Sequence, residues 1–214
     1  MNESLPSSAG IPQPDQLDES DSAMSVVNLP FQQPVYLVGM MGAGKTTIGR
    51  ALARRLGWDF VDLDHELEAR CGVRVSLIFD IEGEQGFRKR ETALLDDCTR
   101  RSGIVLATGG GAVLAPENRR VLRERGVVVY LRANVDELFR RVGRDRNRPL
   151  LQTDNPRQRL QELVEQREPP YEEVAHLIFD TGSMPINQTT RVLLKQLQDY
   201  SVPAQRDQSA GHSD

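Results

Sequence analysis

The chain has 214 residues, of which 27 are Lys or Arg and 31 are Asp or Glu, so its formal net charge is −4. A mildly acidic chain gives no overall electrostatic reason to bind nucleic acid or an anionic membrane, and no apolar run approaches the roughly 20 residues that span a bilayer. The length suits one globular domain, and Cys71 and Cys98 lack metal-ligand spacing, so we expect a soluble protein with free thiols in the cytoplasm.

Residues 1–32 have the composition of a flexible acidic arm. They contain no Lys or Arg and are rich in Ser, Pro and Gln, and such a chain buries too little apolar surface to order itself. A secretory signal needs a basic start and an apolar core, and a transit peptide is rich in Arg, so neither description fits. Residues 201–214 form a similarly polar tail. The sequence therefore predicts one folded domain over residues 33–200.

Short β-rich runs alternate with segments of helical periodicity along this domain. Strands are predicted at residues 35–38, 59–61, 104–107, 127–131 and 177–179. Helices are predicted at residues 45–56, 64–71, 86–101, 116–125, 135–142, 156–166 and 186–198. Nearly continuous apolar strands that alternate with helices are typical of βαβ units. We therefore predict an α/β fold, a three-layer doubly wound sandwich with a five-stranded parallel sheet, in which ligands bind beyond the carboxyl ends of the strands.

The first predicted strand is followed by GMMGAGKTT at residues 39–47. This stretch satisfies G-x-x-x-x-G-K-[ST] after a strand and before a helix, so its glycines allow backbone N–H groups to wrap a phosphate. The pattern assigns Lys45 to the β and γ phosphates and the Thr46 hydroxyl to Mg²⁺. An ordinary tight turn would explain the glycines but neither of these two side chains. The residues expected at the nucleotide are Gly42, Ala43, Gly44, Lys45, Thr46 and Thr47.

Several classes of P-loop protein share that motif. A GTPase carries N-K-x-D for guanine, which is absent here, and a motor-type ATPase usually ends a buried strand with a metal-binding acid. The run at residues 104–107 continues instead with Thr108 and three glycines. These differences favour a small-molecule kinase of the P-loop type.

Asp62 and Asp64 follow the second predicted strand at spacing i and i+2. If the strand runs through both, the two carboxylates project to one side at its carboxyl end. One could then hold a metal-bound water and the other could orient or deprotonate an attacking hydroxyl. The alternative is that Asp62 ends the strand and Asp64 caps the next helix. The neighbouring P-loop favours the functional interpretation.

Three glycines, Gly109, Gly110 and Gly111, follow the third predicted strand. They face the same crevice if the sheet is parallel, and they offer bare N–H groups to hydroxyls or an oxyanion, although a plain flexible turn would also explain them. Arg88 lies three residues before Glu91 on a predicted helix, where the acid can hold the guanidinium group in position. Arg167 stands beside two prolines that stiffen the chain, and its guanidinium group suits a carboxylate.

Residues 143–155 are polar, rich in arginine and without clear periodicity, which predicts a mobile loop. Such a loop can close as a lid that excludes water and brings a cation to the transferring phosphoryl group. Arg148, directly before an apolar Pro-Leu-Leu, is our candidate for that cation. Arg141 is either a solvated charge or a residue that stacks on adenine. The three histidines have no metal spacing or nucleophile partner, so we expect them to be structural or solvated.

Taken together, these residues resemble the shikimate kinase family, which has the nucleoside monophosphate kinase fold. The resemblance spans about residues 33–200 and rests on six stretches in this order: GMMGAGKTT, DLD at 62–64, FRKRE at 87–91, GGG at 109–111, RPLL at 148–151 and R-x-P-x-Y at 167–171. The family phosphorylates the 3-hydroxyl of shikimate with MgATP on the route to chorismate and the aromatic amino acids. The resemblance therefore implies Mg²⁺ as cofactor and ATP as co-substrate.

The resemblance also implies a role for each matched residue. Lys45 would contact the transferred phosphate, Thr46 would bind Mg²⁺, and Asp62 would reach the metal through water. Asp64 would orient or deprotonate the shikimate hydroxyl, and Arg148 would be the lid cation.

On the acceptor side, the family pattern implies that Arg88 and Arg167 grip the carboxylate of shikimate and that Gly110 and Gly111 meet its ring hydroxyls. Adenine would lie between an arginine matching Arg141 and a proline after the last strand, here Pro185. Pro170 stands where the family commonly has leucine, which would shift the turn at Arg167 slightly.

Two other functions remain open at this point. A kinase for another small polyol, such as gluconate, would use the same fold and loop. A nucleotide-gated binding module would close its lid on ATP without transfer, although it would have no physical need for the whole set of polar residues. The expected partners are small molecules, shikimate and ATP, with no nucleic acid or membrane partner, and a monomer is expected.

Overall fold

The computed structural model describes residues 26–142, 149–151 and 153–201, and it confirms the predicted fold class. Neighbouring strands are parallel throughout the sheet, whose order is β2-β3-β1-β4-β5. The five strands are β1 (Val35–Val38), β2 (Asp59–Asp62), β3 (Ile104–Ala107), β4 (Val127–Arg132) and β5 (Leu177–Asp180). Each lies where the sequence predicts a strand, and β2, β4 and β5 extend one residue further. The strands end toward one edge of the sheet, which is where ligands collect in such folds.

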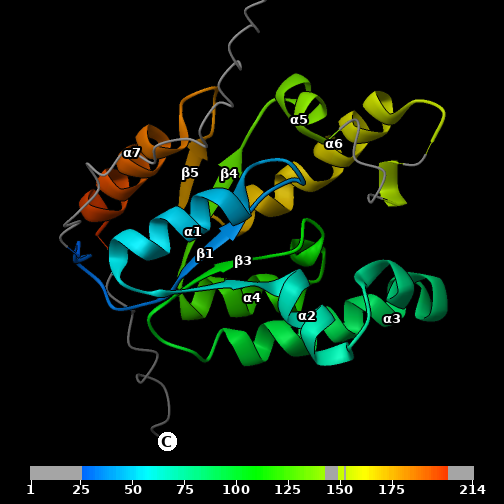
Figure 1. Cartoon of the computed structure of the whole chain (residues 1–214), viewed down its shortest axis with the longest axis horizontal. Coiled ribbons are helices and arrows are strands. Elements are labelled where there is room, and N and C mark those ends of the chain that lie inside the picture. The colour runs from blue at the N-terminus through cyan, green and yellow to red at the C-terminus, as the bar shows by residue number, and fades with distance from the viewer. Residues whose placement is uncertain (1–25, 143–148, 152, 202–214) are drawn as a thin grey trace, which may run out of the picture.

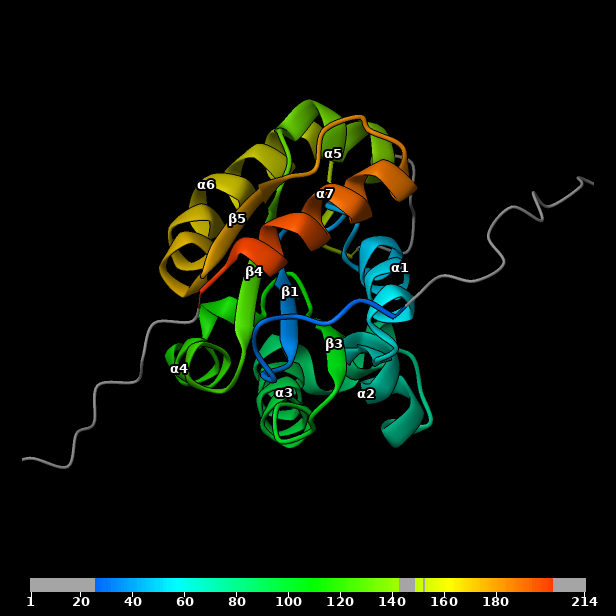
Figure 2. The same ribbon diagram turned by 90° about the vertical axis from the view of Figure 1, so that its left-hand side faces the viewer.

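Helices cover both faces of this sheet (Figures 1 and 2). α1 and α7 pack together on one face, and α3, α4 and α6 lie on the other. The helices are α1 (Lys45–Leu56), α2 (Leu63–Cys71), α3 (Val75–Cys98), α4 (Pro116–Arg125), α5 (Val135–Val142), α6 (Pro156–Val174) and α7 (Ile186–Asp199), with short 3₁₀ turns η2 (Ala112–Leu114) and η3 (Pro149–Leu151). None of the described helices is long and apolar enough to cross a membrane.

Two predicted helices differ from the structure by more than one residue at an end, and α3 also stops at Cys98 rather than at residue 101. α3 begins at Val75 rather than at residue 86, and Gly83 interrupts it with φ 69°, so the two halves do not share one continuous periodicity. α6 runs on to Val174 instead of ending at residue 166, although it contains two prolines. Proline removes backbone donors but can be tolerated where packing holds the helix. The buried residues of α6 continue at helical spacing past both prolines, namely Leu160, Leu163, Arg167, Tyr171 and Val174.

The packed part of the chain extends further toward the N-terminus than the predicted boundary at residue 33. Leu29 and Phe31 are buried in the core, the N–H of Val27 donates to the carbonyl of Arg55 at 3.0 Å, and the Phe31 ring meets Tyr200 edge to face. Apolar residues within a polar stretch therefore dock onto the domain. The rest of the predicted arm, and residues 202–214 of the predicted tail, lie outside the described residues.

Candidate active site

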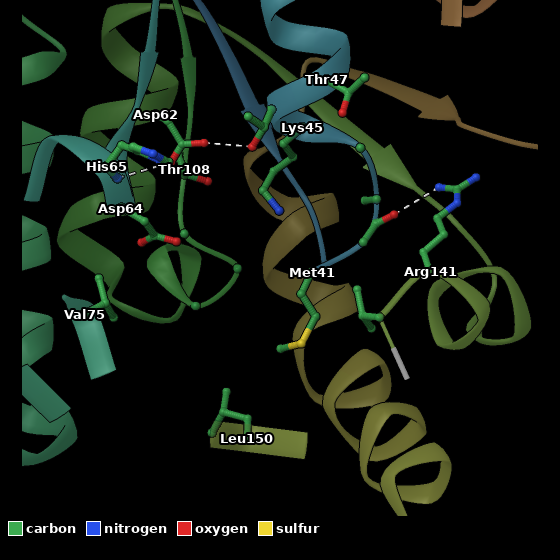
Figure 3. Close-up of a pocket in the computed structure, with 18 of the residues that line it drawn as sticks. Met41, Lys45, Thr47, Asp62, Asp64, His65, Val75, Thr108, Arg141 and Leu150 are labelled. Carbon is green, nitrogen blue, oxygen red and sulfur yellow. Dashed lines mark hydrogen bonds between the residues drawn. The ribbon is translucent and has the colours of Figure 1, made fainter. Parts of the chain in front are cut away.

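A cavity of about 1310 Å³ opens at the carboxyl ends of β1, β2 and β3, and most of the predicted site residues line it. These are Gly42, Ala43, Gly44, Lys45, Thr46, Thr47, Asp62, Asp64, Arg88, Gly109, Gly110, Gly111, Arg141 and Arg167. In Figure 3, Lys45 lies near the centre of the view, with Asp62 and Asp64 to one side and Arg141 to the other. One continuous cavity thus joins the phosphate-binding loop to the predicted acceptor residues.

The P-loop takes a conformation that needs glycine at its ends. Gly39 has φ 141°, and a Cβ there would lie 2.5 Å from the carbonyl oxygen of Leu131. Gly44, directly before α1, has φ 95° and leaves the helix without a side-chain cap. The first backbone N–H groups of α1 therefore have no capping side chain and point at the cavity with the positive end of the helix dipole. This arrangement suits a phosphate.

Lys45 and Thr46 are held in place by bonds within the protein. The Lys45 ammonium donates to the carbonyl oxygens of Gly39 at 2.7 Å and Met40 at 2.9 Å. The Thr46 hydroxyl donates to Oδ2 of Asp62 at 2.8 Å, which ties the start of α1 to the end of β2. A hydroxyl beside a carboxylate is a pair of hard oxygen donors of the kind Mg²⁺ prefers.

Within the described part of the chain no group of three or more His, Cys, Asp or Glu side chains is arranged to hold a metal ion. A cation bound by Thr46 and Asp62 would therefore take most of its ligands from water and nucleotide. Mg²⁺ commonly binds in this way, because it keeps several waters and needs only one or two protein ligands. The residues present fit that ion.

The strand does not run through both acids, as one reading of the sequence supposed. β2 ends at Asp62, and Asp62 is the N-cap of α2, where its carboxylate accepts from the N–H of His65 at 3.5 Å. Asp64 lies in the first turn of α2, so the capping role considered for Asp64 belongs to Asp62. Leu63 is buried and turns into the core. Both carboxylates nevertheless line the cavity (Figure 3).

The partly exposed Arg88 and the buried Glu91 form an ion pair on α3. Nη1 of Arg88 lies 2.6 Å from Oε2 of Glu91, as their spacing predicted, and Arg88 also contacts Glu84 at 3.2 Å. Glu91 is only 1% exposed, and its Oε1 has no hydrogen-bond partner among the described residues. Burial raises the pKa of Glu91 against the opposing attraction of Arg88. Glycine at position 109 leaves room for this carboxyl, since a Cβ there would collide with Oε1 of Glu91 unless that side chain moved.

Arg167 reaches the same region from α6. Its side chain is buried, and within the described chain its Nε has no hydrogen-bond partner. Burial, with the nearby charge of Arg88, lowers its pKa, but a guanidinium group keeps its proton in proteins. A Cβ on Gly111 would collide with the Arg88 guanidinium, and one on Gly110 would lie 3.6 Å from Nη1 of Arg167. Two cations therefore border one glycine turn, which is suited to an anionic group.

Arg141 joins the P-loop to the loop after β5. Its guanidinium group donates to the carbonyl oxygens of Gly42 at 3.0 Å and Gly182 at 2.8 Å. Pro185 is the N-cap of α7, and it does not line the cavity, whereas its neighbours Met184 and Ile186 do. Arg148 lies outside the described residues, so its assignment as the lid cation stays a prediction.

Part of the cavity wall was not found from the sequence. It comes from α2 and the first half of α3, and its members are His65, Glu68, Arg74, Val75, Ser76 and Phe79. Residues 75–82 were not predicted to be helical, so nothing marked them as a wall. Tyr171 was also missed: its hydroxyl donates to the carbonyl of Gly110 behind the turn. The signal available for it was its position four residues after Arg167, on the same helix face.

The sequence matches a family model described as Shikimate kinase over residues 41–198. A shikimate kinase of Bordetella avium is 66% identical over 175 residues, which cover 82% of this chain and 84% of that protein. A shikimate kinase of Bordetella pertussis is 67% identical over 172 residues, which cover 80% of this chain and 82% of that protein. The similarity extends from the P-loop into the last helix.

Solved structures agree with these matches. A shikimate kinase from Acinetobacter baumannii in complex with shikimate is 47% identical and superposes with a TM-score of 0.77, covering 78% of this chain and 94% of that chain. A shikimate kinase from Aquifex aeolicus is 30% identical, with a TM-score of 0.68, and the alignment covers 77% of this chain and 95% of that chain. Both alignments span nearly the whole of the known structure.

Proposed function

The chain belongs to the shikimate kinase family, and from this membership we propose that it transfers the γ-phosphoryl group of ATP to the 3-hydroxyl of shikimate. The products are shikimate 3-phosphate and ADP, and the reaction belongs to the route to chorismate and the aromatic amino acids. Shikimate brings one carboxylate and several ring hydroxyls, and the acceptor side of the cavity offers guanidinium groups and a glycine turn that complement them.

The observation that carries this proposal is the buried guanidinium group of Arg167. A buried cation with an unpaired donor destabilises the protein, because moving it out of water costs free energy that hydrogen bonds or an opposite charge have to compensate. Arg167 keeps an unpaired Nε and lies near a second cation, Arg88. An acceptor with a carboxylate supplies the missing negative charge, whereas a neutral polyol does not. The site therefore favours a carboxylated alcohol, and the bare glycines leave room for a ring to lie close. Gluconate also carries a carboxylate, so a panel of acceptors has to separate it from shikimate.

In the proposed reaction the acceptor hydroxyl oxygen forms a bond to the γ phosphorus, and the bond from that phosphorus to the bridging oxygen of ADP breaks. Asp64 orients the hydroxyl and receives its proton. Arg88 and Arg167 hold the carboxylate, which fixes the ring so that the hydroxyl faces the phosphate. Such positioning lowers the barrier, because the two reactants no longer have to find each other in the correct orientation.

On the nucleotide side the P-loop N–H groups and Lys45 compensate the charge of the phosphates. Thr46 and, through water, Asp62 hold Mg²⁺ in this proposal, and the ion supplies further charge compensation on the phosphate oxygens when it is bound. Arg141, at the edge of the P-loop, provides a flat cationic surface for adenine. Arg148 is proposed as the cation that the lid brings to the transferring group.

The test is an ADP-release assay with purified protein, MgATP and a panel of acceptors. We expect turnover with shikimate and formation of shikimate 3-phosphate, detected by mass spectrometry. The methyl ester of shikimate is the matched control, because it keeps every hydroxyl and loses only the charge that Arg88 and Arg167 bind. We expect it to be a much poorer substrate.

The same panel separates the other functions. Turnover with gluconate but not with shikimate would identify a polyol kinase and contradict the proposal. Binding of ATP without consumption of any acceptor would identify a nucleotide-gated binding module. Equal turnover of shikimate and its methyl ester would leave the reaction in place but remove the proposed role of the two arginines.

A further inference from the structure

Tyr171 connects three parts of the active site from behind. It is completely buried in α6, and its hydroxyl donates to the carbonyl oxygen of Gly110 in the glycine turn and contacts Sδ of Met40 in the P-loop at 3.6 Å. Its ring stacks on Tyr130 of β4 with centroids 4.9 Å apart. Tyr171 itself does not line the cavity, whereas Gly110 and Gly111 do. The hydroxyl therefore holds the turn on the side away from the ligand.

The direction of that hydrogen bond determines what the turn presents to the ligand. The chain has no cis peptide bond among the described residues, and in a trans peptide the C=O of one residue and the N–H of the next point in opposite directions. If the Gly110 carbonyl points back to Tyr171, the Gly111 N–H points forward. No hydrogen bond from the Gly111 N–H to another described residue is present, so this donor is available to a ligand.

The hydroxyl is well suited to this task. Burial raises the pKa of Tyr171 well above its ordinary value, so the group stays neutral and keeps the proton that it donates. The ring cannot move easily, because it is packed against Tyr130 on a central strand. Glycines flank the peptide that it holds, and without a side chain such a peptide has more freedom to rotate than any other. The Tyr171 hydroxyl is thus a fixed donor to the Gly110–Gly111 peptide, which has no side chains of its own to restrict its rotation.

We propose that Tyr171 is a positioning residue for the acceptor: its hydroxyl fixes the Gly110–Gly111 peptide so that the Gly111 N–H points into the cavity and donates to a ring hydroxyl of shikimate. This inference rests on the proposed function for the identity of the acceptor. It assigns no contact between Tyr171 and either substrate. The hydroxyl also faces the guanidinium group of Arg167, so the glycine amide resonances, in addition to KM, are needed to show that Tyr171 acts through the peptide that it orients.

The test compares Tyr171→Phe with Tyr130→Phe. Both substitutions remove one hydroxyl from the same stacked pair, but no hydrogen bond from the Tyr130 hydroxyl to another described residue is recorded, so it serves as the matched control. For Tyr171→Phe we expect the KM for shikimate to rise roughly 3- to 10-fold with kcat almost unchanged, as for loss of a binding contact that is equal in the ground and transition states. We expect the KM for ATP to stay within about two-fold in both variants.

A purely structural role predicts a different result. If Tyr171→Phe raises both KM values together and lowers the melting temperature more than Tyr130→Phe does, or fails to fold, the hydroxyl supports the fold alone and the proposal is overturned. Kinetics indistinguishable from those of Tyr130→Phe would overturn it as well. One hydrogen bond is small against the stability of a domain, so we expect both variants to fold.

Glycine-selective ¹⁵N labelling gives a readout that does not depend on turnover. We expect the amide resonances of Gly110 and Gly111 to shift between ligand-free wild type and Tyr171→Phe and to stay in place in Tyr130→Phe. An unchanged Gly111 resonance would contradict the proposal whatever the acceptor is. If the wild-type protein does not phosphorylate shikimate, the proposed function fails, and the amide shifts still decide whether Tyr171 orients the turn.

Discussion

The two halves of the active-site cavity are built on opposite principles. On the nucleotide side, Lys45 donates to two carbonyl oxygens and Thr46 donates to Asp62. Arg141 donates to one carbonyl oxygen in the P-loop and to another in the loop after β5. On the acceptor side, Glu91 and Arg167 are buried, and each has one polar atom without a partner among the described residues. The polar groups of the nucleotide half are paired within the protein, whereas the acceptor half contains buried charged groups with atoms that a ligand can pair.

This difference has a physical origin. A P-loop binds phosphate mainly with backbone N–H groups, which are fixed by the fold and bear no full charge. A small cyclic acid offers few atoms to bind, so its recognition depends on a few charged side chains in a desolvated place. The nucleotide half should therefore lose activity without gaining stability when it is altered. The acceptor half should lose activity and gain stability when one of its buried charged groups is replaced by an apolar one.

Asp64→Asn gives the largest expected effect. The amide cannot take the proton of the acceptor hydroxyl, so we expect kcat to fall by about 10²- to 10⁴-fold, the usual contribution of a general base. Because Asp64 belongs to the acceptor half, the affinity for ATP, measured by fluorescence titration with a nucleotide analogue, should stay close to wild type. A fall in ATP affinity as large as the fall in kcat would show that the two halves are not separate. Wild-type kcat would remove Asp64 from the chemistry.

Lys45→Met tests the nucleotide half. Loss of one positive charge at the phosphates should lower kcat by about 10²- to 10³-fold, as for removal of one preorganised donor. We also expect a lower melting temperature, since the carbonyl oxygens of Gly39 and Met40 lose their donor. Lys89→Met, on the exposed face of α3, is the control and should change neither quantity. A Lys45→Met variant more stable than wild type would contradict the statement that the polar groups of this half are paired within the protein.

Arg167→Met should separate stability from binding. We expect the KM for shikimate to rise about 10- to 100-fold through loss of a charged contact. We expect the ligand-free protein to become more stable, because an apolar side chain replaces a buried cation that has an unpaired donor and lies near the charge of Arg88. Urea unfolding of the two proteins measures this. Arg159→Met is the control, because Arg159 lies on the same helix but is partly exposed and paired with Glu162; it should leave both quantities near wild type. A destabilised Arg167→Met would mean that the charge of Arg167 is already compensated within the protein.

The nucleotide half was easier to predict from the sequence for the same reason. GMMGAGKTT is contiguous, and the strand before it and the helix after it fix its shape, so local pattern and tertiary structure agree. Asp62 was predicted to lie at the end of a strand, and it does, although it also caps α2. When a motif is contiguous in the sequence, the strand and helix that flank it can be predicted from the same short stretch, and so its conformation can be predicted too.

The acceptor half draws on residues far apart in the chain. The pairing of Arg88 with Glu91 is local and was anticipated, but the approach of Arg167 and Tyr171 to the glycine turn depends on α6 passing two prolines, which a local reading takes as the end of a helix. The wall at Val75 and Phe79 depends on a helix broken at Gly83. Tertiary packing overrides local signals at these two places, so the sequence could name the arginines but not the surface around them.

The smallest expected effects are on the pH dependence of stability, and the contrast here is between Glu91 in the acceptor half and His176 at the opposite end of the sheet. Burial raises the pKa of Glu91, so the folded protein binds the extra proton, and this carboxyl makes folding less favourable as the pH rises through its raised pKa. Glu91→Gln should flatten that part of the stability profile. The effect belongs to the acceptor half, where a buried acid is only partly paired.

His176, at the far end of the sheet, should act in the opposite direction. Its Nδ1 accepts from the N–H of Val128 at 3.0 Å, and burial, with the charge of Arg123, lowers its pKa from an ordinary value of 6.5. The folded protein therefore binds fewer protons than the unfolded chain as the pH falls below that value, so the free energy of unfolding should decrease with falling pH until the lowered pKa is passed. Urea unfolding of wild type and His176→Asn between pH 7.5 and about 5 measures this, because the Asn side-chain oxygen can replace Nδ1 as acceptor without titrating in this range. Identical slopes for the two proteins would mean that folding does not lower the pKa of His176 and would contradict this prediction.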